Sequence, residues 1–223
     1  GIAGGTAIDC IITNCYAVRG GGSSSATLIR CRLMDCFVET GATNAHGALA
    51  STTAVGMYNG NAYDSYLGND VLNLGVTLNC FCTVVRNNNG NPMSRVYNSY
   101  VETDYGYQAF TNCVLKGTVS ASSVRDADTL VGTALSFDAN SRPLAGQVNA
   151  IDRGMLAHYA YPAAFAHEQG LGDLFGGQRV SNGQIDIGPG EYDWRGDFAK
   201  ALAKKGVAVE VATANVTTNL EAG

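Results

Sequence analysis

A ten-residue pattern recurs near the start of the chain at a spacing of 21 residues. Residues 6–15 read TAIDCIITNC and align with residues 27–36, which read TLIRCRLMDC. Shorter copies, each a β-prone run followed by Asn or Asp and a small residue, lie at residues 76–80, 95–99 and 109–113. A repeat this short cannot bury its apolar side alone, so successive copies must stack on one another.

Short strands joined by corners rich in Gly and Asn are what a coiled parallel sheet needs. Gly and Asn tolerate the left-handed backbone conformation of sharp corners, and Gly provides 28 of the 223 residues. Small side chains such as Cys, Ala and Val fit a narrow interior in which equivalent positions stack about 4.8 Å apart. Leucine-rich repeats have a similar period, but they require regularly spaced leucines, which this sequence lacks. We therefore predict an all-β fold of the parallel β-solenoid type.

Several segments depart from this repeat. Residues 40–74 are Ala-rich and then rich in Gly, Asn and Tyr, so we expect irregular turns with a loop excursion there. A last strand is expected at residues 135–138 and a turn at residues 143–146. A short helix interrupted by Pro162 is expected within residues 156–167.

The end of the chain carries helix and strand signals. Asp197 is a candidate N-cap for a helix over residues 198–205, with Gly206 as its stop. The alternation that follows predicts a strand. Because a lone strand needs a sheet edge, we expect it to pair with another copy or module, through Val207, Val209, Val211 and Thr213. The predicted organisation is therefore turns over residues 1–118, final turns with a capping block over residues 119–195, and a helix plus strand over residues 196–223.

Composition excludes several classes of protein. Disorder is excluded because 46% of the residues are hydrophobic and the formal net charge is only −5. The sequence contains no apolar run of about 18 residues, which a membrane-spanning helix would need. It also lacks the clustered Lys and Arg that neutralise phosphates, so we predict no nucleic-acid partner.

The acidic side chains of the repeat region do not form a catalytic pattern. Glycoside hydrolysis requires two carboxyl groups placed across a sugar bond. Asp9 and Asp35 each precede a cysteine of the repeat and are interpreted as corner residues. Glu102 and Asp104 have no basic neighbour in the sequence and fit a solvated loop. We therefore predict no catalytic residue, and a hydrolase or lyase would instead require Asp64, Asp70, Glu102 or Asp104 to take part.

Metal and cofactor sites are not indicated by the histidines or the cysteines. His46, His158 and His167 lack the spacing of three or four residues that a helical metal site uses. Zinc sites usually combine tight Cys pairs, whereas the first two pairs here are five residues apart. We predict no metal and no cofactor, and we interpret six cysteines as buried thiols stacked on one another, namely Cys10, Cys15, Cys31, Cys36, Cys80 and Cys113.

Eleven tyrosines leave two interpretations open. Many of them lie between Tyr58 and Tyr107, interleaved with Asn and Gly. Exposed tyrosines serve carbohydrate and protein contacts, because the ring stacks and the hydroxyl hydrogen-bonds. Stacking of tyrosines within the fold explains the same pattern equally well.

Two segments near the end carry a family resemblance. Residues 143–154 read PLAGQVNAIDRG and residues 176–192 read GGQRVSNGQIDIGPGEY. Together with the Asn-Cys repeats, they resemble the terminal block of bacterial right-handed parallel β-helix repeat proteins, which are large surface or secreted polypeptides. In that family the two halves usually read SPAIDAG and DIGAxEY. This sequence departs from the pattern at residues 147–149 and 189–190, and the resemblance covers roughly residues 1–195.

The resemblance implies a right-handed parallel β-helix with a C-terminal capping block. It also implies a non-enzymatic, extracellular structural or adhesive module of a bacterial surface protein or filament. Its expected partners are other copies of itself, neighbouring modules and glycans. Because lyases and hydrolases of polysaccharides share this fold, a carbohydrate-binding or polysaccharide-degrading protein is the alternative, and a phage tail-fibre-like protein is a weaker one. Residues of the block expected to cap the open end of the fold are Asp152, Asp186 and Glu191.

Overall fold

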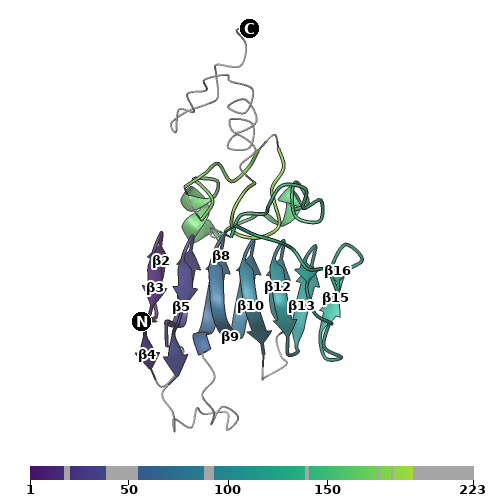
Figure 1. Cartoon of the computed structure of the whole chain (residues 1–223). Coiled ribbons are helices and arrows are strands. Elements are labelled where there is room, and N and C mark those ends of the chain that lie inside the picture. Colours follow the sequence, from purple (N-terminus) through teal and green to yellow (C-terminus); the bar gives the residue numbers. More distant parts are fainter. Residues whose placement is uncertain are drawn as a thin grey trace, which may run out of the picture. The chain divides into compact units, whose positions relative to one another are not determined.

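The computed structural model describes residues 1–17, 21–38, 55–87, 93–138, 141–174, 176–181 and 183–192. The chain divides into two compact units, Gly1–Glu191 and Tyr192–Gly223. All strands of the described residues belong to the first unit, which is drawn in colour in Figure 1. The regular secondary structure of the described part is therefore almost entirely β, apart from two short 3₁₀-helices.

Fourteen strands join in one sheet, two more form a separate pair, and the strand pairings are parallel throughout the described residues. The strands are β1 (Ile2–Ala3), β2 (Thr6–Ile8), β3 (Ile11–Thr13), β4 (Tyr16–Ala17), β5 (Ser23–Ile29), β6 (Arg32–Met34), β7 (Phe37–Val38), β8 (Val55–Tyr63), β9 (Tyr66–Leu78), β10 (Phe81–Arg86), β11 (Ser94–Tyr97), β12 (Tyr100–Asp104), β13 (Gln108–Thr111), β14 (Val114–Leu115), β15 (Val124–Arg125) and β16 (Leu130–Val131). Two short 3₁₀-helices follow, η1 (Leu156–His158) and η2 (Ala163–Glu168).

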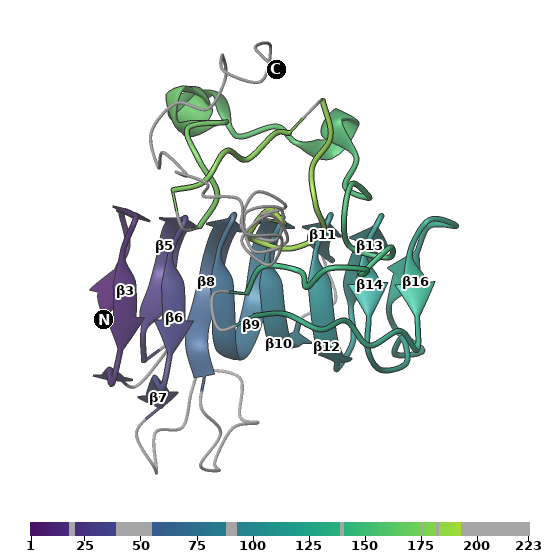
Figure 2. The same ribbon diagram turned by 45° about the horizontal axis from the view of Figure 1, so that its top comes forward.

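Each pass of the chain contributes one strand to each of two ladders. The first ladder consists of β2, the ends of β5, β8 and β9, and then β11, β13 and β15. The second ladder consists of β3, β6, the start of β9, β10, β12, β14 and β16. Successive passes follow one another across Figure 1, from purple β2 to teal β16. Figure 2 shows strands of the two ladders, such as β5 and β6, as neighbours within one pass.

The spacing between passes is regular only at the start. Cys31 lies 21 residues after Cys10, its equivalent in the first pass. The corner residues that precede them, Arg30 and Asp9, bond to each other. The next equivalents are 34, 15, 19 and 14 residues apart. The repeat of 21 residues thus identified the first two passes correctly, whereas later passes are shorter or contain an insertion.

Residues 55–74, where irregular turns of the coil were expected, form paired strands with shifts of register. They belong to β8 and β9, which are the longest strands of the sheet. β8 pairs with β5 on one side and with β9 on the other, with Ala26 opposite Gly60. A strand held on both sides gains its hydrogen bonds from its neighbours, so pairing outweighs the low strand preference of Gly and Asn.

A sharp corner connects the two ladders in each of the first six passes. One residue at each corner has a left-handed backbone conformation with φ between 45° and 53°. Asn and Asp tolerate this conformation better than other non-glycine residues, which explains why an Asn or Asp precedes the small residue of the repeat. These corner residues are Asp9, Arg30, Asp64, Asn79, Asn98 and Asn112.

The core lies between the ladders and contains apolar side chains and thiols. Leu28, Leu33 and Leu67 are completely buried and belong to one cluster with the inner cysteines. Cys10 and Cys15 of the first pass are partly buried and pack against the same cluster. The interior is thus filled by side chains that repeat from pass to pass.

Residues 143–191, here called the closing segment, run along the corners of the passes. Residues 135–138 do not form the expected last strand; within them, Phe137 makes one isolated antiparallel bridge to Pro143. Phe137 instead packs by its side chain against Phe81 and Tyr100. The expected turn is present, with Ala145 and Gly146 in turn conformation. The helix expected within residues 156–167 is two 3₁₀-helices, one on either side of Pro162.

Aromatic contacts hold the closing segment against the first ladder. Tyr159 and Tyr161 form a buried cluster with Ile29, Tyr63 and Leu78. These three ladder residues each precede a corner and point away from the core, because neighbouring side chains of a strand alternate. Figures 1 and 2 show the segment, in green, beside the strand ends rather than beyond β16.

Some expectations concern residues outside the described part. These are the helix with its cap Asp197, the assembly strand with Val207, Val209, Val211 and Thr213, and His46. Among the described helices, none has the length and apolar character needed to span a membrane.

Candidate functional site

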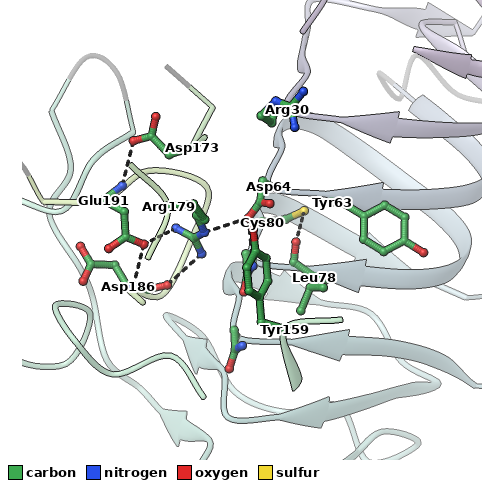
Figure 3. A network of polar contacts seen from close by, with 12 residues as sticks. Arg30, Tyr63, Asp64, Leu78, Cys80, Tyr159, Asp173, Arg179, Asp186 and Glu191 are labelled. Carbon is green, nitrogen blue, oxygen red and sulfur yellow. Dashed lines mark hydrogen bonds and ion pairs between the residues drawn. The ribbon is translucent and has the colours of Figure 1, made fainter. Parts of the chain in front are cut away.

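A fully buried arginine joins the closing segment to the corners of the ladders. Arg179 has no exposed surface and lies between two buried carboxylates, Asp64 and Glu191 (Figure 3). Its Nη1 donates to Glu191 Oε1 at 2.7 Å, and its Nη2 donates to the Asp186 carbonyl at 3.1 Å. Its Nε lies 2.9 Å from Asp64 Oδ1 without making a hydrogen bond, so that contact is an ion pair only.

Asp64 receives contacts from three directions. Besides Arg179, Asn79 donates from the next corner to Asp64 Oδ1 at 2.9 Å, and the Tyr161 hydroxyl donates to Oδ2. Burial raises the pKa of Asp64, while Arg179 opposes that rise. Burial and the negative charge of Asp64 raise the pKa of Tyr161, which keeps that hydroxyl protonated as a donor. The corner carboxylate is therefore fully engaged in holding two parts of the closing segment.

Glu191 organises the other side of the network. Its Oε1 accepts from the Asp186 amide at 3.0 Å, and its own amide donates to Asp173 Oδ2 at 3.1 Å. Asp186 Oδ1 in turn accepts from the Asp152 amide at 2.7 Å. The three residues predicted to cap the fold, Asp152, Asp186 and Glu191, thus bond to one another and to Arg179. These bonds hold the closing segment together, and Arg179 connects it to the corner residue Asp64.

Several carboxylates around one buried guanidinium change the protonation of Glu191. Burial raises the pKa of Glu191 to about 8, although Arg179 favours the charged form, and the nearby Asp186 adds to the rise. The folded protein therefore holds a proton that the unfolded chain, with a pKa of 4.5, releases. The stabilisation from this proton is complete below the unfolded value and is lost as the pH rises through the folded one.

The free energy of unfolding is accordingly expected to fall between about pH 4.5 and about pH 8, by up to about 1.4 kcal/mol per pH unit in the middle of that range. Glu191→Gln, which imitates the protonated acid, should remove this slope. Urea titrations of both proteins across that range measure the effect. Parallel pH profiles of the two proteins would show that Glu191 is charged in the folded state.

Two corner asparagines extend the attachment toward the last passes. Asn98 donates from Nδ2 to the Met155 carbonyl at 3.0 Å and accepts from the Met155 amide at 2.9 Å. Asn112 donates to Asn98 Oδ1 at 2.8 Å and to the Arg153 carbonyl at 2.9 Å. At the opposite end, Arg30 binds Asp9 and Glu168. The closing segment is therefore bonded to corners from the second pass onward.

A groove of about 340 Å³ lies on the outer side of the second ladder. Its floor is a row of aromatic rings in which Tyr66 stacks on Phe81 at 4.9 Å and Phe81 contacts Tyr100 at 5.2 Å. Arg32 lies over the Tyr66 ring at 5.5 Å. The groove thus combines ring edges with a charged and polar rim, formed by Arg32, Glu102, Asp138 and Ser141.

The described tyrosine rings mostly contact other rings. Tyr63 lies 4.9 Å from Tyr161, and Tyr97 stacks on His158 at 5.4 Å. Only Tyr105 and Tyr107 are among the exposed large side chains of the described residues, with 58% and 40% exposed. Stacking within the fold therefore explains most of these rings.

The structure brings the predicted cysteines into register. Cys10 lies beside Cys31, and Cys15 lies beside Cys36, in neighbouring passes. Cys80 and Cys113 occupy the same corner position in later passes. Ser65 occupies this position between Cys31 and Cys80, and Ser99 occupies it between Cys80 and Cys113. These serines accept from the amides of Cys31 and Cys80, and Thr129 does the same for Cys113.

The candidate acids do not gather in one place. Glu102 binds Lys116 at 2.9 Å, a basic partner from the next pass that the sequence did not indicate. Asp104 accepts from the amides of Gly106 and Ser120, which fixes a loop. Asp64 belongs to the buried network, and the side chain of Asp70 lies outside the described part. His167 contacts Glu168 at 3.4 Å on the surface.

The arrangement offers structural attachment and one small polar groove. Within the described residues, no three His, Cys, Asp or Glu side chains gather as a metal site would require. Sequence reasoning missed Arg179, because its partner Asp64 comes from a distant part of the chain. Its other partner, Glu191, lies 12 residues away in the same terminal block, and this proximity was the available signal. The chain matches no family model, no curated protein and no solved structure.

Proposed function

We propose that this chain is a right-handed parallel β-helix module with a structural or adhesive role. The parallel pairing of both ladders and the stacking of like residues support a coil in which each pass is one turn. The parallel connections between strands of one sheet support right-handedness, because nearly all such connections are right-handed. The resemblance to bacterial surface and secreted β-helix proteins supports an extracellular location.

One observation carries the non-enzymatic role. Asp64 and Arg179 are fully buried charged groups, and they face each other where the closing segment meets the corners of the ladders. Neither of them lines the groove. A catalytic pair of carboxylates would need to face a substrate from both sides. Here the buried carboxylates are held by Arg179, Tyr161 and backbone amides, which suits a rigid scaffold.

A polysaccharide-degradation assay tests this proposal. The purified chain is incubated with polygalacturonate, alginate, xylan and arabinan, and released oligosaccharides are measured by chromatography. We expect no release above a buffer control. Release that disappears in Glu102→Gln, but persists in Lys116→Met, would establish an enzyme. Antibody labelling of intact cells of the source organism tests the location, and labelling only after lysis would oppose it.

Glycan binding is the second candidate, and the groove over the second ladder favours it. Its rim offers Arg32 as a donor and Glu102 as an acceptor beside aromatic edges, a combination used in sugar recognition. Affinity electrophoresis in gels containing each polysaccharide tests this function without requiring turnover. Retardation that is lost in Arg32→Ala, with Arg125→Ala as the control, would support it.

A further inference from the structure

The first two passes place Cys15 and Cys36 next to each other. Ile12 pairs with Leu33 before them, and Tyr16 pairs with Phe37 after them, both in parallel register. Cα atoms of neighbouring parallel strands lie about 4.8 Å apart, within the range of about 4.4–6.8 Å that disulfides span.

Local geometry points the two thiols the same way. Each follows a corner residue with left-handed backbone, Asn14 with φ 53° and Asp35 with φ 51°. Cys15 Sγ donates to the carbonyl two residues before it at 3.3 Å, and Cys36 Sγ does the same at 3.2 Å. After burial, the neighbouring Cys15 side chain is among the groups that raise the pKa of Cys36, as expected for two thiols that lie close together.

The Cys10–Cys31 pair has a similar arrangement, but Cys31 is more deeply enclosed than Cys36. Cys31 donates to the carbonyls of Ala7 and Ile29, as Cys36 donates to those of Ile12 and Met34. Burial raises the pKa of Cys31 to about 11. Cys80, Cys82 and Cys113 are buried in the core, beyond the reach of a small oxidant. Cys15 is partly exposed, as Cys10 is, so one member of the Cys15–Cys36 pair is accessible.

We propose that Cys15 and Cys36 form an intramolecular disulfide when the folded chain meets a small-molecule disulfide such as oxidised glutathione. The bond joins the first pass to the second. Among the described strands, β1–β4 of the first pass pair only with strands of the second pass. The crosslink therefore secures a pass that has a paired neighbour on one side only, and this inference does not depend on the proposed function.

The chemistry is a two-step thiol–disulfide exchange. The Cys15 thiolate attacks one sulfur of oxidised glutathione, which breaks its S–S bond and releases one glutathione. The Cys36 thiol then loses its proton to water, and its thiolate attacks the Cys15 sulfur of the mixed disulfide. That step forms the Cys15–Cys36 bond and releases the second glutathione. Two thiols are oxidised and one glutathione disulfide is reduced.

Burial raises the pKa of Cys36, so the second step is expected to quicken as the solution becomes more alkaline.

Thiol titration and peptide mapping test the proposal. The folded chain is treated with oxidised glutathione, and free thiols are counted in denaturant with Ellman's reagent. We expect two of the seven thiols to be lost. Trypsin cleaves after Arg30 and Arg32, which separates Cys31 from Cys36 and identifies the partner. The peptide ending at Arg19 should be joined to the peptide that contains Cys36.

Matched variants distinguish the assignments. Cys10→Ala should still lose two thiols, whereas Cys15→Ala should lose none. Cys36→Ala should keep one glutathione attached to Cys15, because the second step has no attacking thiol. Retention of all seven thiols in the wild-type chain, a crosslink from Cys10 to Cys31, or stable glutathione attachment to wild-type Cys15 would each overturn the proposal. Circular dichroism of every variant confirms that folded proteins are being compared.

Discussion

Replacing Arg179 with methionine is expected to lower the free energy of unfolding by about 3–5 kcal/mol. The substitution leaves Asp64 and Glu191 buried without the cation between them. It also removes the donor to the Asp186 carbonyl. Methionine fills much of the same volume, so the loss reflects the uncompensated Asp64 carboxylate and the missing hydrogen bonds rather than a cavity. Urea denaturation followed by circular dichroism measures the change.

Two further variants show whether the charges are responsible. Adding Asp64→Asn to Arg179→Met should recover part of the loss, because it removes the buried carboxylate that is left without its cation. Lys116→Met breaks an ion pair on the surface and should leave the unfolding midpoint unchanged, since exposed pairs contribute little. An unchanged midpoint for Arg179→Met would mean that the network does not hold the closing segment.

Gly60→Ala is expected to destabilise the protein by about 4 kcal/mol or to prevent folding, which places it among the most severe single substitutions. Gly60 has φ 126°, a conformation that residues with a side chain rarely adopt. A Cβ there would also overlap the backbone oxygen of Ala26 in β5. Since β8 is paired on both sides, neither strand can move away without breaking its ladder.

Gly183→Ala is the matched control for this substitution. Gly183 has φ 75°, and nothing lies within 4 Å of the position that a Cβ would occupy. Only the backbone conformation is penalised there, at a cost of about 1–2 kcal/mol. Thermal unfolding of both variants separates the two contributions. Equal losses for Gly60→Ala and Gly183→Ala would show that the close approach of β5 and β8 is not rigid.

The repeats predicted the local structure well where neighbouring passes have the same length. The alignment of residues 6–15 with residues 27–36 corresponds to real parallel pairs. It did not extend to residues 55–74, because pairing of β8 on both sides is a property of the sheet and not of the local sequence. It also failed for residues 135–138, where Phe137 contributes its ring to the outer aromatic row and not its backbone to the sheet.

The site was harder to predict than the ladders. The terminal block directed attention to Asp186 and Glu191, and both belong to the buried network. The sequence does not show which corner receives Arg179, because that choice depends on the path of the closing segment across several passes. Ser65 was missed for a related reason, although the copy at residues 95–99 already ended in Ser99: a hydroxyl can replace a thiol in the stack, since both are small and both meet neighbouring backbone groups.

Two features define the proposed β-helix: the parallel strands wind as a coil, and the closing segment lies along the corners of that coil. An electron-density map of the crystallised chain measures both directly. The account predicts a right-handed coil in which Leu28 lies between Ala7 and Ala62 on adjacent passes, with Arg179 between Asp64 and Glu191. Antiparallel pairing of these strands, a left-handed coil, or an Arg179 side chain in solvent would contradict it.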